Sequence, residues 1–218
     1  MRIEELVDKK HFPLWGILGA IVGLIFILTP QIFYVGALDE PFSMFNHYVS
    51  ELGELGVSEL AWMFNAGMVL AGILFIPFMI GLGFYIDNII SKITILVSVF
   101  SCVSIVFVGI YPMNYLTEHS ISAISFFLSG MVMTFLWAIA ILFQKEFRIH
   151  KGLSLGGFLN MTIFILFLYG PWESTGGTRP EFSMSATLEW AIYFAIVGYL
   201  LTLALYVWRK ESRVKSDQ

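Results

Sequence analysis

Charged residues are scarce in this sequence. Asp, Glu, Lys and Arg make up 13% of its 218 residues, whereas 58% are hydrophobic. Soluble domains are about one quarter charged, so this composition excludes an ordinary soluble fold. The sequence also has no basic cluster interleaved with aromatic residues, which argues against nucleic acid as a partner. We therefore expect an integral membrane protein whose partners are membrane lipids.

The sequence has only one cysteine, and it lacks two common sequence motifs of phosphate-binding and metal sites. The single cysteine, Cys102, lies within an apolar run, which excludes an internal disulfide and a cysteine-based metal site. No lysine follows a glycine-rich stretch in the register of a phosphate-binding loop, and no His-Glu-x-x-His occurs. Any metal or catalytic site must therefore be assembled from residues far apart in the chain.

What the sequence has in abundance is long apolar runs. A bilayer core is crossed by about twenty apolar residues in a helix, and six runs reach that length. We predict an all-α polytopic membrane bundle of six transmembrane helices, a single domain over residues 1–218. The predicted spans are residues 14–36, 60–86, 93–111, 121–143, 153–172 and 186–208.

The basic residues support this number of spans. If both termini are cytoplasmic, eleven of the twelve Lys and Arg residues fall on the inner face, and only Arg179 falls outside. This is the distribution that the positive-inside rule describes. We therefore predict that both termini are cytoplasmic and that the chain is a multi-pass protein of the cell membrane.

One polar stretch, residues 45–54, separates the first two apolar runs. Its apolar residues are partly spaced for a helix, and we predict a short helix over Met44–Leu52, lying against the outer ends of the spans. His47 and Glu51 are four residues apart, so on that helix they would share one face. Ser50 would point about 100° away from Glu51.

Four ionisable residues from separate segments are predicted to lie at one membrane level and to converge on an outward-facing pocket: His47, Glu51, His119 and Glu189. Glu189 lies about one turn inside the last span, where an unpaired carboxylate costs free energy. Because zinc takes imidazole and carboxylate ligands, these four residues are candidate ligands of a divalent metal. The first hypothesis is therefore a metal-assisted lipid hydrolase or transferase, with Ser50, Glu51 and His119 as catalytic residues.

Two further hypotheses stay open, and the sequence does not decide whether the protein is an enzyme. Ionisable groups near spans also mark ligand pathways, so the protein could instead bind or transport a lipid or small molecule without catalysis. In the third hypothesis, His47, Glu51 and His119 form a structural hydrogen-bonded clasp that ties the outer loop to the bundle.

Three residues are candidates for ligand binding: Arg179, Trp172 and Ser122. Arg179, as the one outer cation, suits an anionic headgroup or a salt bridge with Glu173 or Glu181. Ser122 belongs to a stripe of hydroxyl residues at helical spacing. Such a stripe either lines a cavity that opens at His119 or bonds the carbonyl groups one turn back.

The stretch His47-Tyr48-Val49-Ser50-Glu51-Leu52-Gly53 resembles the His-x-x-Ser-Glu-Leu-Gly signature of the archaeal and bacterial membrane family catalogued as domain of unknown function 998. Tyr111-Pro112 and His119 also fit that family's pattern. The arrangement is more distantly similar to autophagy-modulator and GPI-anchor-remodelling membrane proteins, whose last span has a Glu-Trp-like pair, here Glu189-Trp190. The resemblance implies a six-span bundle with an outer polar site and a link to lipids, but no particular reaction.

Overall fold

The computed structural model describes residue 8 and residues 11–36, 40–170 and 179–216. This part of the chain is helical and contains no strand, and six of its helices are long and apolar enough to cross a membrane. The predicted fold class is thus confirmed. The six helices are α2 (Phe12–Ile32), α3 (Ala61–Ile86), α4 (Ile89–Ile110), α5 (Leu116–Leu142), α6 (Ser154–Tyr169) and α7 (Met184–Ser216). Two short 3-10 helices accompany them, η1 (Val49–Gly53) and η2 (Lys151–Leu153).

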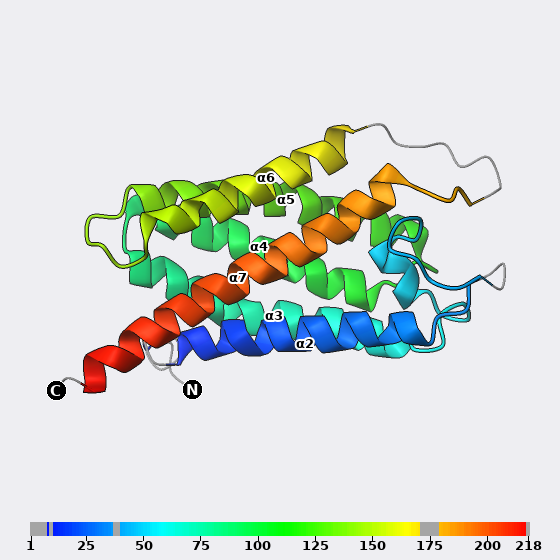
Figure 1. Cartoon of the computed structure of the whole chain (residues 1–218), viewed down its shortest axis with the longest axis horizontal. Coiled ribbons are helices and arrows are strands. Elements are labelled where there is room, and N and C mark those ends of the chain that lie inside the picture. The colour runs from blue at the N-terminus through cyan, green and yellow to red at the C-terminus, as the bar shows by residue number, and fades with distance from the viewer. Residues whose placement is uncertain (1–7, 9–10, 37–39, 171–178, 217–218) are drawn as a thin grey trace.

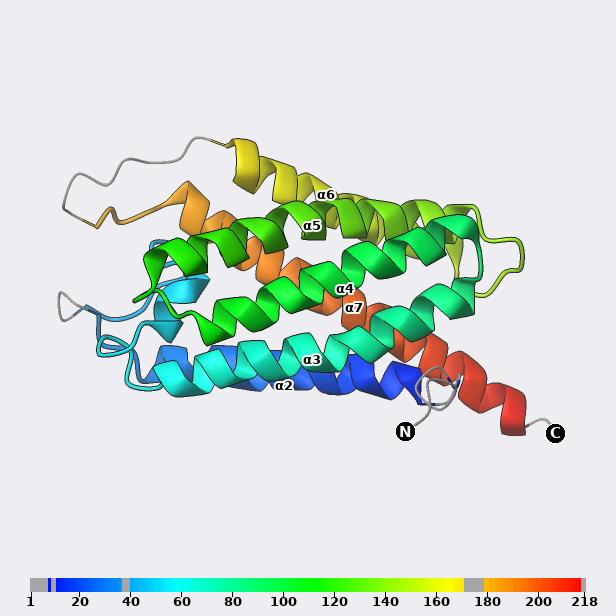
Figure 2. The same ribbon diagram turned by 180° about the vertical axis from the view of Figure 1, so that it is seen from behind.

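The helices form a closed up-and-down ring. Each packs against the next along the chain, and α7 returns to pack against α2. Figures 1 and 2 show that α2 begins and α7 ends at the same end of the bundle, which we call the terminal end. The loop with η1 covers the opposite end, which we call the polar end.

The described basic residues are divided unequally between these two ends. Lys92 lies at the start of α4, three lie between α5 and α6, and four lie near the end of α7, all at the terminal end. Among the described Lys and Arg residues, Arg179 alone lies at the polar end. A cytoplasmic terminal end follows from the positive-inside rule and stays a prediction.

The helices differ from the predicted spans mainly at their ends. α2 stops at Ile32, and Tyr34 forms an isolated bridge with Ser58 instead of continuing the helix to residue 36. α5 begins at Leu116, so its first turn includes His119. α7 continues to Ser216, beyond residue 208, because Lys, Arg and Glu are good helix formers outside the apolar run.

Glycines allow neighbouring helices to approach closely. A Cβ atom on Gly72 of α3 would lie 2.8 Å from the carbonyl oxygen of Cys102 in α4. A Cβ on Gly157 of α6 would lie 2.6 Å from the carbonyl oxygen of Thr134 in α5. Small residues at such contacts are typical of helices packed within membranes, where van der Waals contact drives association.

Candidate functional site

The loop between α2 and α3 contains a shorter helix than predicted. A short helix is present, but it is the 3-10 helix η1 and not a longer helix over Met44–Leu52. Tyr48, directly before η1, is extended, with φ −68° and ψ 153°. Its backbone N–H donates to Glu51 Oε1 at 2.8 Å, which caps η1. Because the extended residue separates His47 from Glu51, the expectation that they share one helical face is wrong.

η1 is fixed tightly against α3. Leu52 is fully buried, and the side-chain amide of Asn65 donates to the carbonyl oxygen of Gly53 at 2.9 Å. A Cβ atom on Gly53 would lie 2.5 Å from Asn65 Oδ1, so a larger residue here would force the Asn65 side chain to shift. η1 is thus a firmly seated wall at the polar end of the bundle.

Arg179 joins three segments of the chain at this end. It forms a bidentate salt bridge with Glu51, with Nη1–Oε1 at 3.1 Å and Nη2–Oε2 at 2.7 Å. Its Nε donates to Glu40 Oε1 at 3.1 Å, and Nη1 also donates to the carbonyl oxygen of Asn46 at 2.9 Å. The Tyr34 hydroxyl donates to Glu51 Oε2 at 3.4 Å. We call the set Tyr34, Glu40, Glu51 and Arg179 the arginine clasp.

The clasp is partly shielded from water, which strengthens its charge interactions. The side chains of Glu51 and Arg179 are 9% and 26% exposed. Burial lowers the pKa of Arg179, but hydrogen bonding and attraction by Glu51 outweigh it, so that the net shift of the pKa is upward. Glu173 lies outside the described residues, and among those described the partners of Arg179 are Glu51 and Glu40, not Glu181.

His47 lies completely buried beside the clasp. Its ring is 4.9 Å from the Phe42 ring and 5.3 Å from the Tyr34 ring, centroid to centroid. Nδ1 lies 2.6 Å from Asn46 Oδ1, and Nε2 lies 3.5 Å from Glu40 Oε1 without hydrogen-bond geometry. Burial first, and the positive charge of Arg179 second, lower the pKa of His47 below its ordinary value. The imidazole is therefore neutral at pH 7.

Because the pKa of His47 is lowered in the folded state, the protein should lose stability in acid. The unfolded chain takes up a proton on this residue near pH 6.5, before the folded chain does, so stability falls as pH drops through that value. We expect the melting temperature in detergent to fall between pH 7.5 and pH 5.5, and to fall less in His47→Gln.

The matched control is His150→Gln, because His150 is exposed at the terminal end. This variant should keep the pH dependence of the wild type. If His47→Gln and the wild type lose the same number of degrees on acidification, the buried histidine does not carry the effect.

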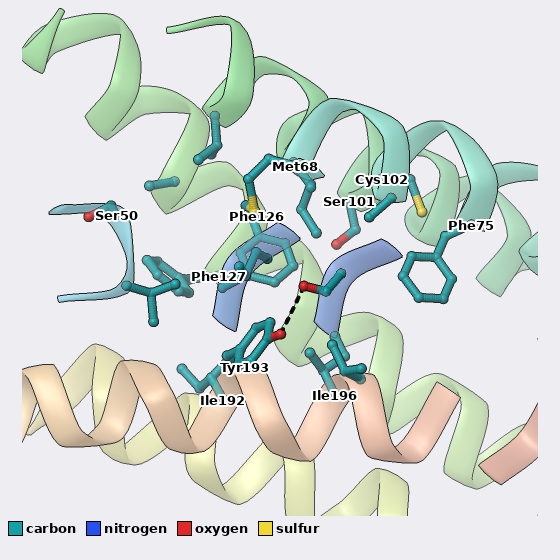
Figure 3. Close-up of a pocket in the computed structure, with 18 of the residues that line it drawn as sticks. Ser50, Met68, Phe75, Ser101, Cys102, Phe126, Phe127, Ile192, Tyr193 and Ile196 are labelled. Atoms are coloured by element: carbon teal, nitrogen blue, oxygen red, sulfur yellow. Dashed lines mark hydrogen bonds between the residues drawn. The ribbon is translucent and has the colours of Figure 1, made fainter. Parts of the chain in front are cut away.

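An apolar cavity of about 100 Å³ lies at the centre of the helix ring. Its walls come from α2, α3, α4, α5, α7 and η1, and α6 contributes none of its lining. Figure 3 shows Ser50 near one end of the cavity and Phe75 and Cys102 near the other. Other apolar lining residues include Ile27, Met68, Ile105, Phe127, Ile196 and Leu200. The cavity thus extends from η1 into the interior of the bundle.

The walls of the cavity are almost entirely apolar, and three polar residues lie at its end next to η1. Ser50, His119 and Glu189 line it together. Glu189 Oε2 accepts the backbone N–H of Val49 at 2.8 Å, which links α7 to η1. His119 Nδ1 lies 2.8 Å from the carbonyl oxygen of Tyr111, so it donates a proton to that oxygen. Three side chains from three segments therefore form a polar mouth, as we call this set.

Comparison with known families gives one result. A family model described as protein of unknown function (DUF998) matches residues 20–208. The chain belongs to this family. The match includes the η1 loop, the polar mouth and all six membrane-spanning helices in whole or in part. No curated protein and no solved structure matches significantly, so the distant likeness to autophagy-modulator and GPI-anchor-remodelling proteins stays a prediction.

In this DUF998 chain the four predicted site residues lie at one end of the bundle, in two groups. Glu51 belongs to the arginine clasp, and His47 lies beside it. His119 and Glu189 line the cavity, together with Ser50. η1 separates the groups, because Glu51 faces Arg179, while Ser50 lies at the end of the cavity with its hydroxyl group directed away from the other lining residues (Figure 3). The sequence argument placed Ser50 and Glu51 in different directions, and the structure pairs Glu51 with Arg179.

The described residues give a metal centre no geometric support. Within residues 8, 11–36, 40–170 and 179–216, no three His, Cys, Asp or Glu side chains are grouped so that they could hold a metal ion. Next to Glu51, the position that a metal would take is filled by the guanidinium group of Arg179. The polar mouth offers one carboxylate and one imidazole, fewer ligands than a zinc site uses.

Of the remaining ligand-binding candidates, Ser122 does not line the cavity. Ser122 donates to the carbonyl oxygen of Glu118 at 2.8 Å, one turn back in α5. Trp172 lies outside the described residues. Ser101 of α4 does line the cavity, and its hydroxyl group is buried without a hydrogen-bond partner among the described residues.

Sequence reasoning missed the roles of Tyr34 and Glu40 in the clasp and of Asn65 beneath η1. Glu40 lies in a loop with other acidic residues, and Tyr34 is one of several aromatic residues near the ends of the spans, so neither stands out in the sequence. The one usable signal was Arg179, because a single outer cation among many acidic residues is expected to form salt bridges with some of them.

Proposed function

We propose that this protein binds a single-chain amphiphile in the cell membrane, with the hydrocarbon chain in the central cavity and the headgroup at the polar mouth. The observation that carries the proposal is a cavity with apolar walls and polar groups gathered at one end. Its lining on α7 extends from Glu189 to Leu200, eleven steps of about 1.5 Å, or about 16 Å. This length is roughly half of the hydrocarbon thickness of a bilayer.

The volume favours one chain over two. Apolar cavities of about 150 Å³ hold a guest the size of benzene. A volume of about 100 Å³, drawn out along the bundle axis, is smaller still, so it leaves room for a segment of one alkyl chain and not for two chains side by side. Burial of each methylene group in such walls contributes about 0.8 kcal/mol.

Binding is better supported than hydrolysis by the geometry of the polar groups. Among the described residues, no hydrogen bond joins Ser50 to His119, although both line the cavity. Glu51 is held by Arg179 and by the Tyr48 backbone, so it is not free to act as a base toward the cavity. An activated nucleophile requires a base within hydrogen-bond reach.

A structural role for the arginine clasp accompanies this proposal. The clasp joins Glu51 of η1 to Arg179, which lies five residues before α7 begins. Glu189 of α7 in turn holds the backbone of Val49. Together these contacts seat η1 over the cavity, so the clasp positions the wall that closes the binding site at the polar end.

Filling the cavity should abolish binding. Gly23 lines the cavity, and a Cβ atom on it would meet no other atom within 4 Å, so Gly23→Leu places a side chain in open space. We expect a photoreactive probe, dodecanol with a terminal diazirine, to label cavity residues of α4, α5 and α7 in the wild type. Gly23→Leu should lose this labelling. The measurement is mass spectrometry of peptides after irradiation of the full chain in lipid nanodiscs.

Gly198→Leu is the matched control, because Gly198 is exposed and a Cβ on it also meets nothing within 4 Å. It should keep the labelling of the wild type. Labelling confined to exposed residues of α6, such as Leu155 and Leu159, in all three proteins would show that the probe stays in the bilayer. That result would contradict the proposal.

A further inference from the structure

We propose that the terminal end of the bundle carries a binding surface for anionic phospholipids, built from the loop between α5 and α6 and the last turns of α7. This end lies opposite the polar mouth, so the surface is separate from the cavity and does not depend on the proposed function. We call it the basic surface, and its members are Lys145, Phe147, Arg148, Lys151, Trp208, Arg209 and Lys210.

A buried glutamine holds the loop of the basic surface in one conformation. Gln144 is 7% exposed, and its side-chain nitrogen donates to the carbonyl oxygens of Ile141 and Ile149. Its Oε1 accepts the backbone N–H groups of Arg148 at 3.0 Å and of Ile149 at 2.9 Å. Ile149 is itself fully buried. Because four hydrogen bonds and a buried anchor fix this turn, the residues between Gln144 and Ile149 are held in place at the surface of the bundle.

The end of α7 is attached to the same loop. The ammonium group of Lys210 donates to the carbonyl oxygens of Phe147, at 2.8 Å, and Arg148, at 3.0 Å. The guanidinium group of Arg148 donates in turn to the carbonyl oxygen of Tyr85 in α3 at 2.5 Å. The basic residues of the loop and of α7 therefore belong to one surface.

The positive charge of this surface exceeds the negative charge within it. Two acids lie in these segments, and both are engaged: Glu146 forms a salt bridge with Arg148 at 2.8 Å, and Glu211 accepts the Tyr85 hydroxyl at 2.8 Å. Three other cations are exposed, and within the described part of the chain none of them forms a salt bridge: Lys145, Lys151 and Arg209. These three side chains are available to an anionic partner.

The position of the basic surface indicates which anion it meets. Its cations begin directly after the apolar runs of α5 and α7, at Lys145 and Arg209, so they lie at the level of the lipid headgroups. Beside them, Phe143, Phe147 and Trp208 are 68%, 59% and 41% exposed. Lys and Arg at this level attract anionic lipids, and aromatic side chains anchor a protein among the headgroups. A soluble anion would use only the cations, whereas cations and exposed aromatic side chains together suit a phospholipid.

The test measures which lipid the full chain retains. The protein is equilibrated in micelles with equal amounts of phosphatidylglycerol and phosphatidylcholine of the same acyl chains, and bound lipids are counted by native mass spectrometry. We expect the wild type to retain phosphatidylglycerol over phosphatidylcholine by at least about tenfold. The triple variant Lys145→Gln, Lys151→Gln, Arg209→Gln should lower this ratio by at least about tenfold, because each basic residue near an anionic surface contributes about fivefold.

A matched pair of lysine variants separates a positioned surface from net charge. Lys151→Gln should lower the ratio about fivefold. Lys92→Gln, at the same end, should change it less than about twofold, because the Lys92 ammonium group is already paired with Asp87 at 3.1 Å. Gln144→Leu keeps every charge but removes the four hydrogen bonds of the loop, so it should also lower the ratio.

Equal retention of the two lipids by the wild type would overturn the inference. So would equal losses in Lys151→Gln and Lys92→Gln, since net charge would then explain the preference, and this pair decides the matter even if Gln144→Leu does not fold. Inorganic phosphate, compared with chloride at the same ionic strength, should leave phosphatidylglycerol bound. Its displacement by phosphate alone would show a site for a soluble anion and would overturn the assignment to a lipid.

Discussion

Replacement of Arg179 by methionine is expected to lower the free energy of unfolding by about 2–3 kcal/mol. The variant keeps a long side chain but removes the cation that two carboxylates share. Glu51, whose side chain is 9% exposed, then keeps its charge in a largely buried position without a salt bridge. Breaking a fully buried ion pair costs about 3–5 kcal/mol, and the partial exposure of Arg179 reduces that figure.

The measurement is unfolding of the full chain in mixed micelles, and a double-mutant cycle separates the ion pair from other effects. Glu51→Gln keeps an acceptor for the Tyr48 N–H while it removes the charge. If the pair carries the loss, Arg179→Met combined with Glu51→Gln should cost clearly less than the sum of the two single variants.

Arg209→Met is the control for the change of residue type, because Arg209 is exposed near the terminal end. It should change stability by less than about 0.5 kcal/mol. If Arg179→Met lowers the free energy of unfolding no more than Arg209→Met does, the clasp is not a stabilising contact. Strict additivity of Arg179→Met and Glu51→Gln in the double-mutant cycle would lead to the same conclusion.

The membrane-spanning helices could be predicted from the sequence because the bilayer imposes a simple rule. In hydrocarbon, backbone groups must be satisfied within the segment, so about twenty consecutive apolar residues indicate one helix. The ends were less predictable. α7 continues past the apolar run to Ser216 because helix propensity, and not hydrophobicity, decides the conformation there.

The candidate site could be predicted in part. Ser50, Glu51, His119 and Glu189 do lie at one end of the bundle, as their positions along the spans required. Their grouping could not be predicted, because it depends on the conformation of one residue. Tyr48 is extended, so η1 starts late and turns Glu51 toward Arg179. The link between Glu51 and Arg179 joins residues 128 positions apart, for which spacing within a helix gives no information.

The cavity could not be predicted from the sequence, because the sequence does not distinguish a glycine that faces open space from a glycine that packs against a neighbouring helix. Gly23 faces open space, and this space forms part of the cavity. Gly109 lies in an equally apolar run, yet it is packed directly against α3. The two kinds of glycine can be distinguished only when the positions of the neighbouring helices are known.

The same substitution at two glycines should therefore have opposite effects. A Cβ on Gly109 would lie 2.5 Å from the backbone oxygen of Asn65 and 3.0 Å from the Cβ of Met68. Because a backbone oxygen cannot turn aside, α3 and α4 would have to separate, and Gly109→Ala should destabilise by about 1–3 kcal/mol. At Gly198 the added methyl group meets nothing within 4 Å, so Gly198→Ala should stabilise the helix by about 0.5–1 kcal/mol.

The substitution Gly109→Ala should also disturb the candidate site. Asn65 holds Gly53 of η1 through its side-chain amide, so a shift of α3 at this level moves the wall of the cavity. We expect Gly109→Ala to weaken labelling by the diazirine probe as well as stability, whereas Gly198→Ala leaves labelling intact. Both quantities can be measured on the same samples. If Gly109→Ala were as stable as the wild type, α3 and α4 could not be in the close contact that seats η1 over the cavity.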